Sequence, residues 1–118
     1  MKLAINREEK KGMLGRAYFL CTIKVTISDE ERRIASERRL LNSPLIGSKD
    51  PSSSDAANLL TVCGRSTISL SDLTNGINAK AEGNQIGLLQ WLEESVREKC
   101  KIVKINLEMI DGDSEEEI

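Results

Sequence analysis

The sequence predicts a single α+β domain with a largely antiparallel sheet of about five or six strands and two helices on one face. Residues 19–27 alternate apolar and polar side chains and are rich in β-branched residues, as in a half-buried strand. Residues 84–100 repeat apolar side chains every three to four positions, which indicates an amphipathic helix. The length of 118 residues suits one domain whose core needs neither disulfide nor metal.

The N-terminal part is expected to form a hairpin followed by a helix. Leu3 and Ile5 alternate with polar neighbours, which predicts a short strand before the strong strand at 19–27, with a turn between the two strands. Ser28 and Glu31 have the spacing of a capping box, in which each side chain binds the other residue's backbone amide. A helix is therefore expected from Asp29 to about residue 40.

The middle of the chain is expected to be a long loop followed by short elements. Residues 42–58 hold two prolines, a glycine and a serine run, which predicts a loop that is either mobile or covers something. Short strands are expected at 59–63 and 67–70. One helical turn over 71–76 and a modest strand over 77–81 follow.

The C-terminal part is expected to hold the second helix, with Asn84 as its cap. Residues 102–110 fit strand alternation and helical spacing alike. Their β-branched content favours a strand, with a continued helix as the alternative. The domain is expected to span 1–110, and the acidic residues 111–118 are predicted to form a disordered tail.

The residue inventory excludes several kinds of catalytic site. The chain has no histidine, which removes the Ser-His-Asp and Cys-His nucleophiles and histidine-containing metal sites. Its cysteines, Cys21, Cys63 and Cys100, form no CxxC pair and lie in apolar runs or on an apolar helix face, so we expect buried, reduced thiols. Lysines flank Cys100 and would activate it if it were exposed, but the apolar helix face is the preferred interpretation. No catalytic residue, metal ligand or cofactor is assigned.

One group of candidate binding residues surrounds a glycine-bounded motif, GMLG, at residues 12–15. The flanking cations are Lys10, Lys11 and Arg16. A basic GxxG loop resembles the backbone clamp of KH nucleic-acid-binding modules, but those loops join two helices and a strand is expected here. A hairpin turn with solvated lysines is the preferred interpretation.

A second candidate group lies on the first helix. Arg33 has acids four residues away on both sides, Asp29 and Glu37, and is expected to be neutralised locally. Arg32 and Arg39 lie off that ladder, so they are the candidates for an anion or acidic-partner surface. A solvated helix face is the simpler alternative.

The absence of catalytic residues favours a small non-enzymatic binding or assembly module over the other function classes. Its partner would be another protein or a second copy of the chain, because a sheet with helices on one face must cover the other. Met13, Leu14 and Leu20 are the candidate apolar contacts. Charge is uneven, at +4 over residues 1–50 and −6 over 51–118, so association is expected to be partly electrostatic.

Two other function classes stay open. The first alternative is a nucleic-acid-associated protein that uses the basic loop and helix, and the second is an enzyme that handles a small anionic substrate without histidine. The N-terminal residues lack the apolar core of a signal peptide, and no apolar run reaches the ~18 residues of a membrane span. We therefore expect a cytoplasmic protein with no membrane partner.

Overall fold

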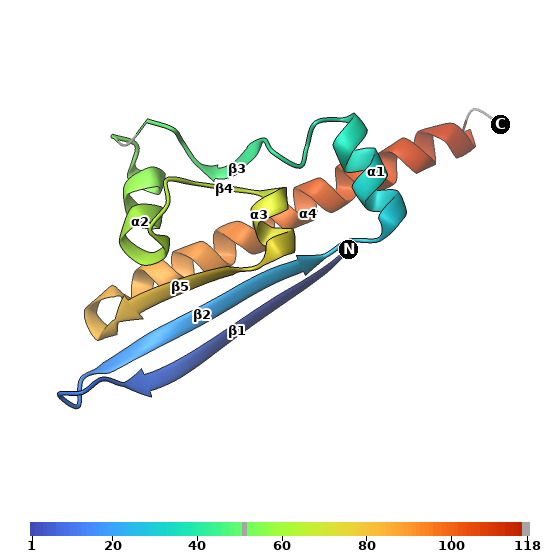
Figure 1. The fold of residues 1–118 in the computed structure, drawn as a ribbon. Helices are drawn as coiled ribbons and strands as arrows, with labels where there is room; N and C mark the ends of the chain where they lie inside the picture. The colour runs from blue at the N-terminus through green and yellow to red at the C-terminus, as the bar shows by residue number, and fades with distance from the viewer. Residues whose placement is uncertain (51, 117–118) are drawn as a thin grey trace.

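A computed structural model describes the backbone of residues 1–50 and 52–116, and the side chains of residues 1–50 and 52–107. The chain is a mixed α+β fold with two separate antiparallel sheets (Figure 1). The elements are β1 (Lys2–Lys11), β2 (Ala17–Thr26), α1 (Asp29–Glu37), β3 (Pro44–Gly47), α2 (Ser54–Cys63), β4 (Thr67–Ser69), α3 (Leu70–Asn75), β5 (Ile77–Glu82), η1 (Gly83–Gln85) and α4 (Ile86–Glu116).

The α+β class is confirmed, but the described residues form fewer strands in one sheet than expected. The main sheet has three strands in the order β1-β2-β5, and β3 and β4 pair only with each other. Two segments predicted as strands, 59–63 and 102–110, are helical instead. The expected sheet of five or six strands is therefore wrong in extent, and the described residues form four α-helices, of which α3 is the expected helical turn and α2 was not expected.

The β1–β2 hairpin is longer than the sequence suggested. Alternation of apolar residues ends near residue 6, yet β1 continues through the charged stretch to Lys11, in register with β2 down to the Lys11–Ala17 pair. β2 holds this part of β1 in place through the backbone ladder, which needs no apolar side chain.

The first helix begins as predicted. The Glu31 amide donates to Ser28 Oγ at 3.1 Å, and the Ser28 amide donates to Glu31 Oε1 at 3.0 Å, so the capping box is confirmed. The helix ends at Glu37, shortly before the expected residue 40, because Arg39 adopts a left-handed conformation with φ of 58°.

The predicted loop at 42–58 contains β3 and the start of α2. Within α2 the buried residues are Ala56, Leu59 and Val62, spaced by three as on one helix face. Ser53 caps its start by accepting from the Ala56 amide at 3.1 Å, and Gly64, with φ of 72°, ends it. The short apolar run at 59–63 was therefore one turn of a helix, which a five-residue pattern cannot distinguish from a strand.

The segment after Gly64 folds largely as predicted. β4 and the single helical turn of α3 follow, and Ser69 caps α3 in a second capping box with Asp72. β5 then adds to the free side of β2. Asn84 is not the cap of the next helix, because it lies inside the 3₁₀ turn η1 that leads into α4.

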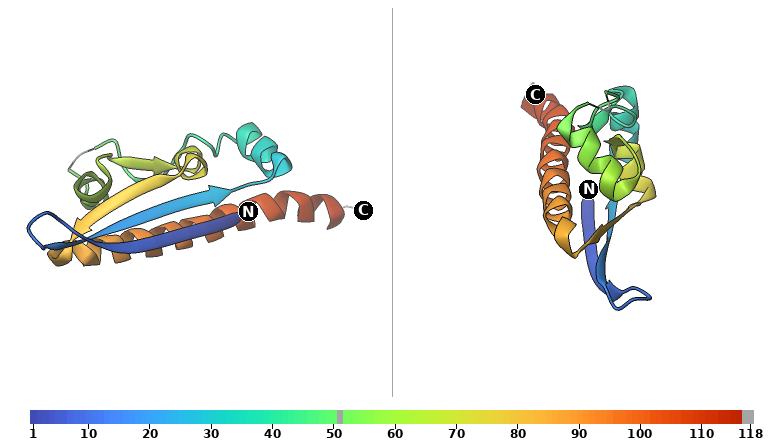
Figure 2. Two further views of the ribbon diagram at one scale, coloured as in Figure 1. Left: turned by 60° about the horizontal axis from the view of Figure 1, so that its bottom comes forward. Right: turned by 90° about the vertical axis from the view of Figure 1, so that its left-hand side faces the viewer.

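Helix α4 runs the length of the sheet and continues through the segment expected to be a strand (Figures 1 and 2). Val103 and Leu107 are buried, whereas Ile102 and Ile105 are exposed. A strand would place Val103, Ile105 and Leu107 on the same face, so this burial fits helical spacing only. The backbone is helical to Glu116, but side chains from 108 onward lie outside the described residues, and the disordered tail at 111–118 stays a prediction.

The core lies on one face of the main sheet. Alternate residues of β2 and β5 face it and are almost fully buried, as are the inward residues of α4. The opposite face is polar, with exposed Thr22, Lys24 and Asn78, and no helix covers it in the described part of the chain. These polar side chains can be solvated by water, so the open face does not itself require burial against a second copy of the chain.

Candidate functional site

The cysteines do not form a reactive site. All three are free, Cys21 and Cys100 are buried, and Cys63 is half-buried. Burial raises the pKa of each thiol to about 11. Only roughly one thiol in ten thousand is then ionised at pH 7, and the thiolate is the reactive form. The prediction of buried thiols is confirmed for Cys21 and Cys100.

A charged pair that the sequence analysis missed connects the sheet to α4. Arg7 on β1 donates from Nε to Glu93 Oε1 at 3.2 Å, and a second bond joins Arg7 Nη2 to Glu93 Oε2. Glu93 is buried, and the Cys21 thiol donates to it at 3.6 Å. With its oxygens occupied in this way, Glu93 holds β1 on the helix.

The sequence contained a signal for this pair in the alternation of β1 and in the helical spacing of α4. Arg7 continues the inward positions of Leu3 and Ile5, and Glu93 follows Leu89 by four residues on the buried face of α4. Two opposite charges that both fall on inward positions of packed elements are expected to meet, since each would otherwise be buried alone.

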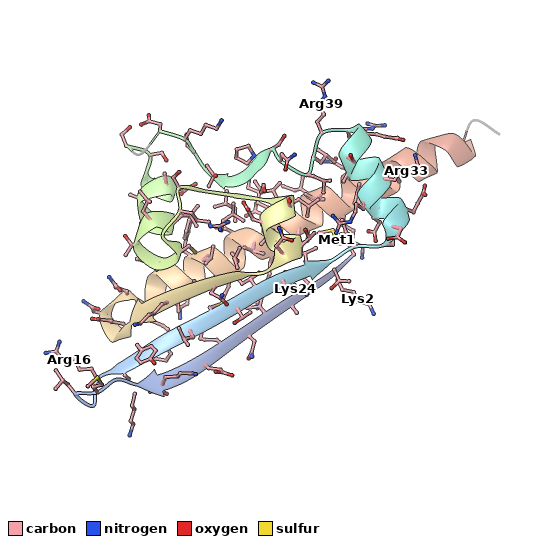
Figure 3. All side chains as sticks on the ribbon, viewed as in Figure 1. Met1, Lys2, Arg16, Lys24, Arg33 and Arg39 are labelled. Carbon is pink, nitrogen blue, oxygen red and sulfur yellow. The ribbon has the colours of Figure 1, made fainter. Side chains whose placement is uncertain are left out.

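The five candidate basic residues do not form one surface. Arg16 lies at the end of the β1–β2 hairpin, whereas Arg39 lies just beyond α1, far from that hairpin end (Figure 3). The two groups are therefore not neighbours on the surface of the molecule, which is 64 Å long. The fold therefore places Lys10, Lys11 and Arg16 on one surface and Arg32 and Arg39 on another, and the binding role of each group stays a prediction.

The α1 group, Arg32 and Arg39, presents less net positive charge than expected. Arg33 is neutralised, by Glu30 and by Glu37, whose Oε1 lies 2.8 Å from Arg33 Nη1; the expected partner Asp29 is not involved. Within the described side chains Arg32 and Arg39 form no ion pair, but they belong to a surface that carries three acids in the first helical turn. An anion would meet mixed charge there.

The hairpin end gathers the other candidates. We call residues 10–16 the hairpin tip. Its turn is closed by the Gly12 amide donating to the Arg16 carbonyl at 2.8 Å, and Gly15 has a φ of 76°. Met13 and Leu14 project from the turn with exposed fractions of 105% and 88%, the largest among the exposed apolar side chains of the described residues.

The hairpin tip carries three cations and no acid: Lys10, Lys11 and Arg16. Lys10 lies 3.8 Å from Glu8, and the side chains of Lys11 and Arg16 form no ion pair within the described part of the chain. This combination of exposed apolar and cationic side chains was recognised from sequence, although the KH-type interpretation is not supported, because the loop joins two strands.

A shallow hollow of about 380 Å³ continues from the hairpin tip onto the open face of the sheet. Tyr18 lies beside the turn, and Lys80 of β5 is stacked over its ring at 4.6 Å. Leu20 follows on the same face, half-buried and opposite Glu8 and Lys80. Leu20 is thus less exposed than Met13 and Leu14, and its role as an apolar contact stays a prediction.

Comparisons of the chain with protein-family models, curated proteins and solved structures find no match. In the described residues no group of three or more Cys, Asp or Glu side chains could hold a metal ion. No helix within that same part of the chain is long and apolar enough to cross a membrane. The hairpin tip is therefore identified as the candidate site on its own geometry.

Proposed function

We propose that the protein is a binding module that docks on an acidic surface of another protein through its hairpin tip. The observation that carries this proposal is the full exposure of Met13 and Leu14. Exposed apolar side chains cost free energy in water, and their burial against a partner recovers about 25 cal/mol per Å². Two adjacent ones on a hydrogen-bonded turn are typical of a protein contact.

The charge of the hairpin tip indicates the chemistry of the partner. Three cations surround the two apolar side chains with no acid between them. Complementary charge steers association and fixes orientation, so the partner is acidic around an apolar depression. We also propose a cytoplasmic location; a second copy of the chain is the alternative partner, which the light-scattering measurement below tests.

A matched pair of variants tests the proposal. The double variant Met13→Ser/Leu14→Ser removes the apolar contact, and Leu60→Ser removes an apolar side chain that is also exposed, on α2. Proteins captured from the native cell by wild type and by Leu60→Ser, but lost with the double variant, would be purified and titrated calorimetrically. We expect the double variant to bind at least about tenfold more weakly, which is 1.4 kcal/mol.

The alternative functions give different outcomes in the same series. Salt-sensitive binding to random duplex DNA that is lost in Lys10→Ala/Lys11→Ala/Arg16→Ala would favour a nucleic-acid function. Co-sedimentation with phosphatidylserine vesicles would favour a lipid surface instead. A dimer seen by light scattering at roughly 100 μM would favour self-association. Partners retained by the Met13→Ser/Leu14→Ser variant would refute the hairpin tip as the contact.

A further inference from the structure

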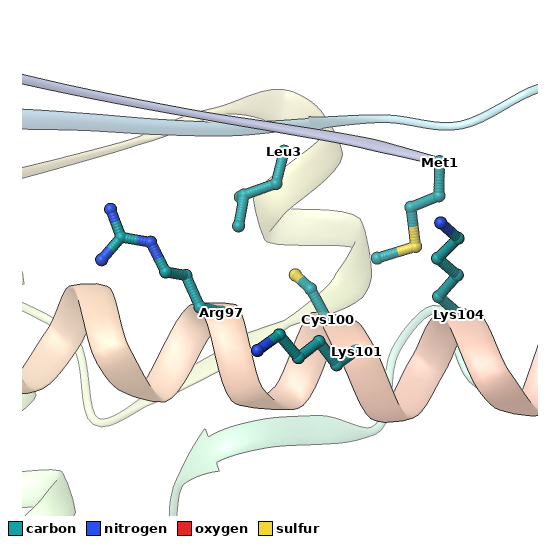
Figure 4. A pocket seen from close by; sticks show the side chains of 6 residues that line it. All are labelled: Met1, Leu3, Arg97, Cys100, Lys101 and Lys104. Carbon is teal, nitrogen blue, oxygen red and sulfur yellow. The ribbon is translucent and has the colours of Figure 1, made fainter.

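A second surface lies at the opposite end of β1 from the hairpin tip. A groove of about 190 Å³ separates the start of β1 from one flank of α4 (Figure 4). We call it the edge groove. Its lining residues are Met1, Leu3, Arg97, Cys100, Lys101 and Lys104.

The edge groove is apolar in its depth and cationic along one rim. Leu3 points from β1 towards Cys100, which is buried in the helix face below it. Arg97 and Lys101 lie one helical turn apart on the flank of α4, and both are exposed. The groove has room for one branched aliphatic side chain with an anion beside it.

The strand that borders the groove has a free edge. β1 is the terminal strand of the main sheet and pairs with β2 alone. Its outer backbone amides and carbonyls therefore have no strand partner in the described structure. Residues 8–11 are all charged, which discourages strand pairing, but residues 2–6 are short of charge and alternate Leu3 and Ile5 inward.

We propose that an extended acidic–apolar segment of a partner protein adds to β1 at residues 2–6 as a fourth strand of the sheet. Side chains of an added strand alternate between the two faces. An inward aliphatic side chain would enter the edge groove against Leu3. The acids two residues before and after it share its face, so they would lie beside the cationic rim of Arg97 and Lys101.

Charge selects this occupant over a second copy of the chain. Pairing of two β1 strands about a two-fold axis would bring the cationic rims of both copies to one seam, where like charges repel. An acidic strand neutralises the same rim. This contact is distinct from the hairpin tip, about 30 Å away at 3.3 Å per strand residue.

The test uses the full chain and a synthetic probe, the capped heptapeptide Thr-Glu-Thr-Leu-Thr-Glu-Thr, whose Glu, Leu and Glu side chains share one strand face. Its binding is followed by NMR amide shifts. We expect saturable shifts at residues 2–6 and 97–104. A control peptide with Lys in place of both Glu residues should bind at least about tenfold more weakly.

Two matched controls separate strand addition from simple charge attraction. Arg97→Ala/Lys101→Ala should weaken the peptide about tenfold, and Lys99→Ala, which removes a cation of the same helix outside the groove, should change it less than about twofold. Two versions of the peptide are N-methylated on alternate amides. Only one set of amides faces β1, so one version should lose binding and the other should keep it.

The proposal is overturned if the glutamate peptide gives no shifts at about 5 mM, if both N-methylated versions bind alike, or if Lys99→Ala weakens binding as much as the groove variant. The Met13→Ser/Leu14→Ser variant should bind the peptide as wild type does. Failure of the hairpin-tip proposal and failure of this one are therefore separate results.

Discussion

The two ends of the β1–β2 hairpin differ in what their side chains do. At the base, Ile23 and Val25 are almost fully buried, and Arg7 is paired with Glu93. At the tip, Met13 and Leu14 contact nothing that buries them. The backbone pairing of β1 with β2 is continuous between the two ends. The exposed end is therefore held in place by this pairing, and the packed end provides most of the stability. The comparison separates residues that fold the protein from residues available to a partner.

The largest difference between the two ends is expected from truncating an apolar side chain in each. Ile23→Ala leaves a cavity in the core and should lower the free energy of unfolding by about 3 kcal/mol. Met13→Ala removes a side chain with no packed neighbours and should change it by less than about 0.5 kcal/mol. Chemical denaturation measures both, and similar losses would contradict the division.

A smaller effect is expected from the charged pair. Glu93→Gln leaves the partly buried Arg7 without its ion-pair partner and should cost about 2 kcal/mol. The control is Glu8→Gln, which changes an exposed carboxylate next to Arg7 on β1 and should cost less than about 0.5 kcal/mol. In the double variant Arg7→Met/Glu93→Leu most of the loss should be recovered, because no buried charge remains unpaired. If the double variant instead lost as much stability as its two single substitutions added together, the Arg7–Glu93 pair would not be what holds β1 on α4.

The cap that follows β2 sharpens the comparison at the packed end. Ser28→Ala removes the acceptor for the Glu31 amide and should cost ~1 kcal/mol. Ser28→Gly should cost only a few tenths of a kcal/mol, because glycine leaves the amide open to water. Equal stabilities of wild type and Ser28→Ala in urea would mean that the bond contributes nothing.

The smallest effect concerns pH. Burial raises the pKa of Asp72, but hydrogen bonds from the Ser69 amide and hydroxyl, and the nearby Arg65, outweigh it and leave that pKa below its ordinary 3.8. A depressed folded pKa means stability that is present above the unfolded value and lost as pH falls through the folded value. Unfolding free energy should therefore fall below about pH 4, and less steeply in Asp72→Asn. Identical acid profiles would contradict this contribution.

Local sequence patterns were sufficient to predict those features that depend only on residues close together in the chain. The capping box at Ser28 and the alternation through Ile23 and Val25 depend only on near neighbours, and both appear as predicted. The prediction of a strand at 59–63 failed because a run of only five residues fits either period. The run at 102–110 failed because alternation could not reveal that Ile105 faces water.

Long-range placement could not be predicted in the same way. The sequence identified the basic residues, but only the fold shows that Arg16 and Arg39 lie far apart (Figure 3). The edge groove brings the start of β1 against α4, whose residues are about a hundred positions further along the chain. The last part of that helix was expected to be a strand. The Arg7–Glu93 pair was accessible in principle, since both charges occupy inward positions.

The central claim is that the hairpin tip is available for binding and dispensable for folding. The most direct measurement compares wild type with Met13→Ser/Leu14→Ser in one denaturation series and one calorimetric titration against a purified partner. We predict an unchanged unfolding midpoint and an affinity reduced at least about tenfold. A lowered midpoint with unchanged affinity would contradict the account, because it would make the two side chains part of the fold and not of the contact.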